Sequence, residues 1–385
     1  MSQTKVPNCY GRNRRGSIHR SNGRAAFPAL VALLGAAIVL LSVSARAQDK
    51  PTFVIQEDCQ AFAISQDNRI VYAVPKIKRV KKVVIERDEI WTSALNGKQK
   101  QIVEVDKFMP VPPPSTYVVN SLAWSPDGRR IVANMTVIKA PPAFSEDDSA
   151  PPPSPEGTKS IALLDDDGHE VKVEGSKTRF IENATHGTWL ADGVSLVYLT
   201  GAGPYNIVRV NPASGNQSTL FEGHLFDDVL WDAKNNRAFA VGKNLSLSSR
   251  LALVELDLLH ESVREIARLD AYQGKMSLSP SGKWIGYFMD GDTIEVRSLD
   301  NPLKPLQASA GFGRFQWSRD EKRVLLKRGS DDRSNDLVWV GLTDETFTPI
   351  LHDLQFTDFQ ITPDGESIAV TDPGKRILKV FPLQQ

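Results

Sequence analysis

The sequence predicts an all-β fold, a seven-bladed β-propeller built from four-stranded antiparallel blades. Three observations predict it: a hairpin-like segment that recurs seven times, repeat spacings close to the length of a propeller blade, and no helical periodicity beyond a turn or two after residue 47. With 385 residues, 41% of them hydrophobic, the chain is long enough for one large repeat fold or two ordinary domains.

Each repeat consists of an apolar run, a four-residue turn and a second apolar run. Large and smaller side chains alternate before the turn, as in Leu122, Ala123 and Trp124, and a period of two is the signature of a strand. The turns are rich in Pro, Asp and Gly, most clearly in residues 125–128 and 362–365, and these residue types suit a tight reversal. The residues that precede the seven turns are Ile64, Trp124, Trp189, Trp231, Leu278, Trp317 and Ile361. We therefore expect seven β-hairpins.

The spacings between these seven residues are 60, 65, 42, 47, 39 and 44. Third and fourth strand-like segments come after the hairpins, and four strands in roughly 40–45 residues make one propeller blade. Two longer links between second and third strands explain the two long spacings: the basic segment 75–82 and an insert over residues 139–158. The insert is rich in Pro, Ser and acidic residues, so we expect a solvated loop there.

The two ends of the repeat region complement each other. The last repeat stops at Gln385 after its third strand, and residues 52–56 match the fourth strand that precedes the first strand of other repeats. We therefore expect the N-terminal strand to complete the last blade, which would close the ring and remove an open sheet edge.

The first residues of the chain have the order of an export signal. Residues 1–24 carry basic and no acidic side chains, residues 25–43 are uncharged and apolar, and a small-residue cleavage pattern ends at Ala47. We therefore predict a signal peptide in residues 1–47 and a propeller domain in residues 48–385. The alternative is an uncleaved membrane anchor, because an apolar run of this length approaches what spans a bilayer. Either way, we expect the propeller to lie outside the cytoplasm, as a periplasmic or secreted protein if the signal is cleaved and as a protein anchored in the membrane by residues 25–43 if it is not.

Two of the repeats resemble a known family. The segments LAWSPDGRRIVAN, from Leu122, and FQITPDGESIAV, from Phe359, resemble the WD-repeat-like blade of the TolB-type propeller family, and the resemblance covers about residues 52–385. It implies a propeller and, because the family includes periplasmic proteins that bind partner proteins, an interaction module. The motif itself is structural and carries no chemistry. We expect no counterpart of the additional N-terminal domain of TolB, so its partner interactions are not carried over.

Motifs for catalysis are missing from the sequence. There is no G-x-S-x-G elbow and no H-E-x-x-H pair, and Cys59 is the one cysteine after residue 47. We therefore expect no catalytic residues, no metal site and no cofactor. The 46 basic and 46 acidic residues balance, which gives no reason to expect nucleic-acid binding. The alternative function is a propeller hydrolase or lactonase with a metal at the central channel, assembled from different blades.

Charged residues precede several of the predicted innermost strands. In a propeller such residues surround one mouth of the central channel, where mixed charge suits a peptide or a small anion. The candidate partner-binding residues are His186, Asp227, Asp228, Lys275, Arg314 and Asp358. The competing interpretation is a rim of solvated residues without a ligand. We predict a monomeric, non-enzymatic module that binds a protein or peptide of the cell envelope, or an accessory module with a separately encoded partner, and we place the segments 75–82 and 139–158 on the same face.

Overall fold

The computed structural model describes residues 50–383 with several gaps. The gaps within this range are residues 56, 81–82, 96, 105–106, 109–110, 112–114, 139–156, 177–178, 244–249, 290–292, 302–304, 310–313, 330–334, 345, 355–357 and 373–376. The chain divides into two units, Met1–Ala47 and Gln48–Gln385, and all described residues belong to the second. The signal peptide or anchor predicted in residues 1–47 therefore lies outside the described residues.

The described part of the chain consists of β-strands and short connections. Its one helical element is a single 3₁₀ turn, η2, at Ala233–Asn235, and it contains no helix with the length and apolar character needed to cross a bilayer. Runs of β-branched and aromatic residues that alternate with smaller or polar ones favour strands throughout. The all-β prediction is confirmed.

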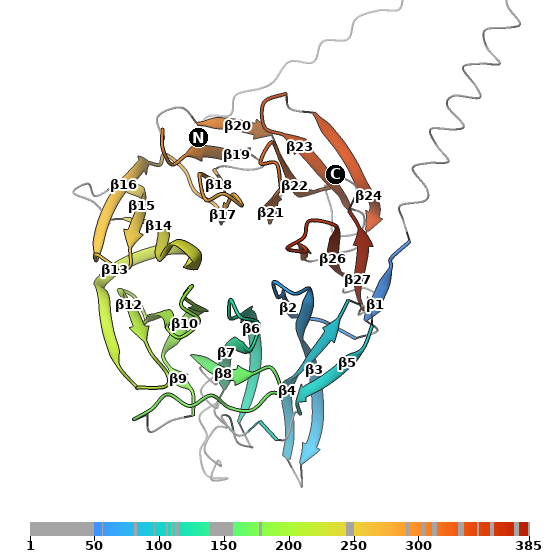
Figure 1. Ribbon diagram of the computed structural model, residues 1–385, viewed down its shortest axis with the longest axis vertical. Coiled ribbons are helices and arrows are strands. Elements are labelled where there is room, and N and C mark those ends of the chain that lie inside the picture. The colour runs from blue at the N-terminus through green and yellow to red at the C-terminus, as the bar shows by residue number, and fades with distance from the viewer. Residues whose placement is uncertain are drawn as a thin grey trace, which may run out of the picture. The chain divides into compact units, whose positions relative to one another are not determined.

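Consecutive strands pair antiparallel into sheets that succeed one another around a common centre (Figure 1). The first two sheets contain β2 (Ala61–Ile64), β3 (Arg69–Val80), β4 (Val83–Ala94) and β5 (Gln99–Val103), then β6 (Thr116–Trp124), β7 (Arg130–Ile138), β8 (Gly157–Asp165) and β9 (Ile181–Glu182). One parallel bridge between Arg87 and Tyr117 joins these two sheets.

The next seven strands form one continuous hydrogen-bonded series. They are β10 (Ala184–Trp189), β11 (Leu196–Thr200), β12 (Tyr205–Val210), β13 (Gln217–Asp232), β14 (Arg237–Lys243), β15 (Leu251–Asp257) and β16 (Ser262–Arg268). The long strand β13 pairs with β12 through its first half and with β14 through its second half. The repeat pattern predicts the fourth strand of one repeat, from Ser218, and the first strand of the next, from Asp227, as separate strands, whereas in the structure both belong to β13.

Three four-stranded sheets complete the unit. They contain β17 (Gly274–Leu278), β18 (Trp284–Phe288), β19 (Thr293–Ser298) and β20 (Leu306–Ser309); β21 (Phe315–Trp317), β22 (Arg323–Arg328), β23 (Asn335–Gly341) and β24 (Phe347–Leu354); and β25 (Phe359–Ile361), β26 (Ser367–Asp372), β27 (Ile377–Pro382) and β1 (Phe53–Ile55).

The N-terminal strand β1 joins the last sheet, as expected for residues 52–56. Phe53 lies opposite Val380 and Ile55 opposite Leu378 in an antiparallel pair. The Ile55 side chain is completely buried in a cluster that also contains Tyr72 of β3. The strand therefore completes the last sheet and packs it against the first.

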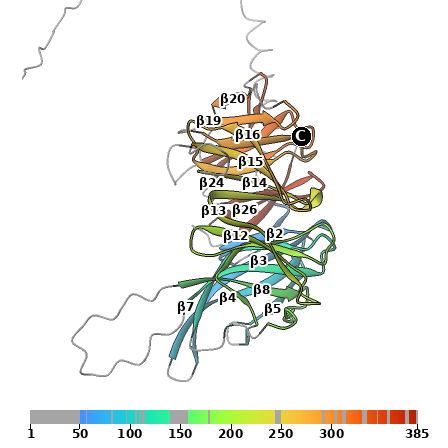
Figure 2. The same ribbon diagram turned by 90° about the vertical axis from the view of Figure 1, so that its left-hand side faces the viewer.

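The basic segment 75–82 departs from the prediction. The sequence predicts a link between strands, but β3 extends to Val80 and pairs with β4 in a register that places Lys78 opposite Ile85. Residues 81–82 of the segment lie outside the described residues. Alternation of Ile and Val with charged residues favours this extended ribbon. Figure 2 shows the ends of β4 and β7 projecting on one side. Of the insert predicted at 139–158, residues 139–156 lie outside the described residues, and Gly157 begins β8.

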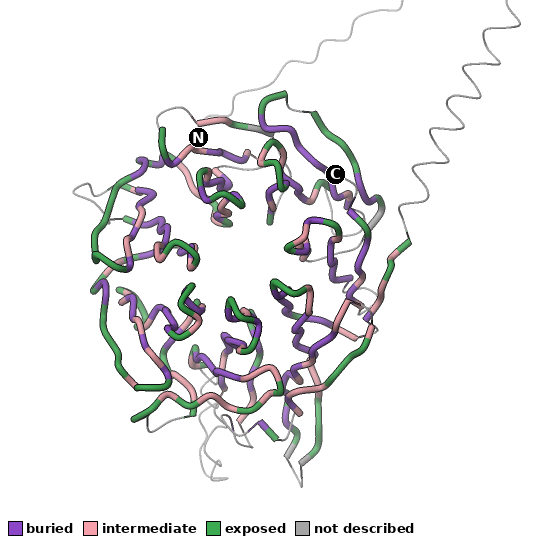
Figure 3. Tube along the Cα trace, viewed as in Figure 1, coloured by how far each residue is buried: buried purple, intermediate pink, exposed green. Residues whose placement is uncertain are grey.

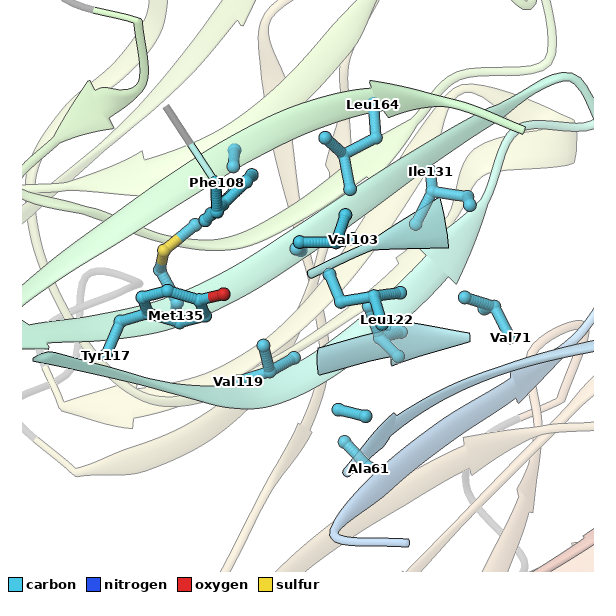
Figure 4. Packing of buried hydrophobic residues seen from close by; sticks show 14 of the residues in the cluster. Ala61, Val71, Val103, Phe108, Tyr117, Val119, Leu122, Ile131, Met135 and Leu164 are labelled. Atoms are coloured by element: carbon cyan, nitrogen blue, oxygen red, sulfur yellow. The ribbon is translucent and has the colours of Figure 1, made fainter. Parts of the chain in front are cut away.

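Apolar side chains pack between neighbouring sheets. Figure 3 shows buried residues concentrated along the middle strands of each sheet and exposed residues along the outermost strands. In the cluster of Figure 4, Ala61 and Val71 of the first sheet meet Leu122 and Ile131 of the second. The other clusters repeat this arrangement from sheet to sheet, ending with the one that joins the last sheet to the first. A sheet buried on both faces needs such neighbours on each side.

Indole N–H groups link neighbouring innermost strands. The Nε1 atoms of Trp124, Trp231 and Trp317 donate hydrogen bonds to the backbone carbonyls of Ala63 (3.3 Å), His186 (2.6 Å) and Ser277 (3.3 Å), each on the preceding hairpin. The first and last hairpins are linked as well, because Asn68 Nδ2 donates to Asp364 Oδ2 at 2.6 Å. These bonds hold the innermost strands side by side, where the candidate site lies.

Candidate functional site

Four of the six predicted site residues line one pocket. Asp228 of β13, Lys275 of β17, Arg314 before β21 and Asp358 before β25 surround a cavity of about 610 Å³. We call the cavity that these four residues surround the mixed-charge pocket. The volume falls in the range of small-molecule and side-chain sites.

Arg314 and Asp358 form an ion pair across the pocket. Arg314 Nη1 lies 3.0 Å and 3.2 Å from the two carboxylate oxygens of Asp358. The carboxylate also accepts a hydrogen bond from the Phe359 N–H (2.9 Å), and the Asp358 N–H donates to Thr371 Oγ1 (3.1 Å). Because both side chains are nearly half exposed, water screens the pair. Its effect is to hold the two groups in place more than to stabilise the fold.

Asp228 and Lys275 can still interact with a ligand. Asp228 accepts hydrogen bonds from the Tyr272 hydroxyl (2.6 Å) and the Val229 N–H (2.9 Å), which fix its orientation. Burial and the Asp228 carboxylate raise the pKa of Tyr272, so this phenol stays a donor. The Lys275 side chain is exposed and has no ion-pair partner among the described residues. An ammonium without a carboxylate partner is available to an acceptor from outside.

Irregularities of the backbone orient the side chains of the pocket. Register shifts, the mark of a β-bulge, occur at the same place on four innermost strands: between Val119 and Ser121, Thr185 and Thr188, Phe226 and Asp228, and Gly274 and Ser277. Lys275 has φ of 65° and His186 φ of 55°, which is uncommon for residues other than glycine. Bulges re-aim side chains and concentrate near binding sites.

The other two predicted residues lie apart from the mixed-charge pocket. Asp227 occupies the bulge of β13 and is exposed to solvent, and it does not line this pocket. His186 lines a different pocket, between the second and third hairpins. It is still close enough to Asp228 for the carboxylate to act on its pKa. The prediction of one ring of six residues therefore becomes a group of four, with two residues beside it.

Sequence reasoning missed the polar residues in the wall of the site. Gln316 lines the mixed-charge pocket, and its side chain accepts a hydrogen bond from the Ile361 N–H at 2.6 Å. Ser277 and Gln316 also line an adjoining cavity of about 330 Å³ that extends to Gln360 and the turn at Pro363. The alternation with period two contains the signal, because these residues are the smaller members between large ones and point to the opposite face of the strand.

The described residues offer no cluster of three or more His, Cys, Asp or Glu side chains that could hold a metal ion. Cys59 is buried, and burial raises its thiol pKa, so the thiol is protonated at neutral pH. Groups within the mixed-charge pocket donate and accept hydrogen bonds and carry charges of both signs. That arrangement is suited to recognition of a polar ligand.

No protein-family model matches the sequence, and no curated protein matches it either. Among solved structures, a chain in the crystal structure of a mitotic checkpoint complex is similar, with 12% sequence identity and a TM-score of 0.59 over 97% of this chain and 99% of that chain. At this identity the likeness concerns the fold alone. Together with the antiparallel four-stranded sheets, it shows that the protein has a WD-repeat-like β-propeller fold.

Proposed function

We propose that this chain is an exported, seven-bladed, TolB-like propeller that acts as a protein- or peptide-binding module and not as an enzyme. The observation that carries the proposal is the mixed-charge pocket, where four innermost strands bring two cations and two carboxylates together. Propellers offer such a surface because their innermost strands converge on one axis.

The blade count rests on the hairpins and the cores between them. The pairs β2–β3, β6–β7, β10–β11, β13–β14, β17–β18, β21–β22 and β25–β26 begin one blade each. Apolar clusters connect every such pair to the next, and the cluster around Ile55 and Tyr72 connects the last to the first. Seven blades with β1 as the final outer strand account for all of these contacts.

A peptide fits the charge pattern better than a simple ion does. The Arg314–Asp358 pair is already neutralised, while Lys275 and Asp228 offer one free positive and one partly satisfied negative group. A ligand that matches them carries both an acceptor and a donor, as polar side chains on a peptide do. Ser277 and Gln316 add hydrogen bonds along the adjoining wall.

The test uses a random dodecapeptide display library selected on the purified propeller. Selected peptides are then titrated against wild type, a K275Q/R314Q variant and a K172Q/K283Q control. The control removes two exposed lysines that line none of the pockets described above. We expect the first variant to lose at least about tenfold in affinity, the size of one or two charge-assisted hydrogen bonds, with the control unchanged. Equal affinity in all three proteins would refute the proposed site.

Export and cleavage are part of the proposal. The basic, apolar and small-residue order of residues 1–47 supports a signal peptide, and a periplasmic or secreted monomer is the expected product. Intact-mass measurement of the protein recovered from its native host tests this. A mass that begins at Gln48 supports cleavage, while retention of the first 47 residues in a membrane fraction supports the anchor instead.

The alternative of a metal-dependent hydrolase or lactonase has no observation among the described residues in its favour. Metal analysis of the purified protein distinguishes the two functions. A stoichiometric transition metal would replace the binding proposal with the enzymatic one.

A further inference from the structure

A second pocket lies between the second and third blades. Its volume is about 930 Å³. The residues that line it are Asn120, Ser121, Asn134, Gly157, Thr158, Lys159, Asn183, Thr185, His186, Thr200, Gly201, Ala202 and Tyr205. We name it the Lys159 pocket. It is separate from the mixed-charge pocket, and its ligand chemistry is independent of the proposed function.

The lining of this pocket has an unusual charge balance. It consists of amide and hydroxyl side chains with short stretches of backbone, and no described lining residue is a carboxylate. Lys159 is the one lysine or arginine among them, and no carboxylate pairs with it among the described residues. A cation surrounded by neutral hydrogen-bonding groups presents a positive site that is not cancelled internally.

Hydrogen bonds hold the cation in place. Lys159 Nζ donates to Thr136 Oγ1 at 3.1 Å, and Asn120 Nδ2 donates to the same oxygen at 2.9 Å. The two donors therefore share one acceptor at the edge of the pocket. Lysine side chains ordinarily lose considerable freedom when they bind a ligand, so a side chain that is already held loses less.

The backbone around the pocket is also held in place. The Asn134 side chain forms hydrogen bonds with both backbone groups of Gly187 on the next blade. Its Oδ1 accepts from the Gly187 N–H (2.6 Å) and its Nδ2 donates to the Gly187 carbonyl (3.2 Å). Asn183 and His186 have φ of 54° and 55°. Such backbone conformations persist where surrounding contacts enforce them, and they concentrate at ligand sites.

We propose that the Lys159 pocket binds a ligand through an oxyanion, a carboxylate or a phosphate group, with Lys159 as the cation and the neighbouring amide and hydroxyl groups as further donors. An oxyanion accepts hydrogen bonds only, so a donor-rich lining without carboxylates matches it. The mixed-charge pocket is a poorer site for an anion, because two carboxylates line it.

His186 makes the binding depend on pH. Loss of hydration has the largest effect and keeps the pKa of His186 below its usual value. Two charged groups also act on its pKa: Asp228 of β13 raises it, and Lys159 of β8 lowers it. An oxyanion in the pocket favours the imidazolium, so binding takes up a proton. Affinity therefore rises as pH falls toward the pKa of His186.

Calorimetric titration of the intact propeller with sulfate and with acetate tests the proposal, at constant ionic strength set with sodium chloride. Sulfate represents the tetrahedral oxyanion and keeps its charge between near pH 5.5 and near pH 7.5. We expect K159Q to bind at least about tenfold more weakly and K159R to retain binding, with the K172Q control equal to wild type. H186N, which suits the left-handed backbone, should bind near pH 7.5 and show a smaller change in affinity than wild type as the pH falls.

The two anions also distinguish the source of the oxyanion. Binding of sulfate alone indicates a phosphate-like ligand, and binding of acetate alone indicates a carboxylate. The proposal is overturned if neither anion binds, or if K159Q binds as tightly as wild type while circular dichroism shows the same fold. Binding that K172Q reduces as much as K159Q does would show only nonspecific attraction and would overturn it too.

Discussion

The mixed-charge pocket and the Lys159 pocket lie on the same repeated framework but offer different chemistry. Both form where innermost strands bulge, and the residues at these bulges are Asn120, His186, Asp227 and Lys275 on successive blades. The backbone pattern is repeated while the side chain changes from amide to imidazole, carboxylate and ammonium. The fold therefore provides equivalent positions with different side chains: Asn120 and His186 line the Lys159 pocket and Lys275 lines the mixed-charge pocket, whereas Asp227 lines neither.

The largest expected effect comes from breaking the framework that both pockets share. An I55D substitution places a charge in the fully buried contact between the last and first blades. We expect it to lower the free energy of unfolding by more than about 3 kcal/mol and to weaken both binding activities together. I55V should cost about 1 kcal/mol. Urea denaturation measures both, and an I55D protein as stable as wild type would contradict closure by β1.

A pH experiment probes the junction beside the Lys159 pocket. Asp88 of β4 accepts a hydrogen bond from the Val119 N–H at 2.6 Å, and burial raises its pKa to about 6. Its unfolded pKa is near 3.9, so the folded state binds the proton more tightly. The contribution of Asp88 is therefore most favourable at low pH and is lost as pH rises from about 4 to about 6.

D88N keeps the acceptor for Val119 and removes the charge. The free energy of unfolding of wild type relative to that of D88N should fall by about 1–3 kcal/mol as the pH rises from about 4 to about 6. Urea denaturation midpoints at several pH values measure this difference. A difference that stays constant with pH would show that Asp88 does not titrate in this way.

Two amide side chains allow a smaller, matched comparison of the pockets. Asn134 clamps Gly187 beside the Lys159 pocket, and Gln316 bonds the backbone of Ile361 beside the mixed-charge pocket. N134A should cost about 2 kcal/mol because it leaves buried backbone groups unsatisfied, whereas Q316A at a half-buried position should cost about 1 kcal/mol. Each should weaken binding only in its own pocket. Reversed ligand effects in the two calorimetric titrations would show that the pockets are assigned wrongly.

Much of the fold could be predicted from local chemistry. The Ser-Pro-Asp-Gly turn at Ser125 forms as its residues suggest, with Ser125 Oγ donating to Asp127 Oδ1 and accepting from the Arg130 N–H. The role of β1 also came from a pattern, because a last repeat without an outer strand needs one. In both cases the information lies within a few residues of the chain or in the repeat itself.

The site was predicted only in part because it depends on registers between strands. Asp227 and Asp228 are adjacent in sequence, yet the bulge exposes one and places the other in the pocket. The Lys159 pocket was not predicted, since Lys159 reads as an ordinary exposed strand residue and Asn134 as part of an N-x-S/T sequon. Lys159 and Asn134 come together with His186 through packing between blades, and the periodicity of the sequence does not indicate which residues of different blades become neighbours.

The most direct test of the account is a cross-titration of the two pockets. Wild type, K275Q/R314Q and K159Q are each titrated with a selected peptide and with sulfate at constant ionic strength. We predict that K275Q/R314Q loses at least about tenfold in peptide affinity and K159Q at least about tenfold in sulfate affinity, with less than about twofold change in the other ligand. Loss of both ligands in either variant, or of neither in both, would contradict two separate sites on one propeller framework.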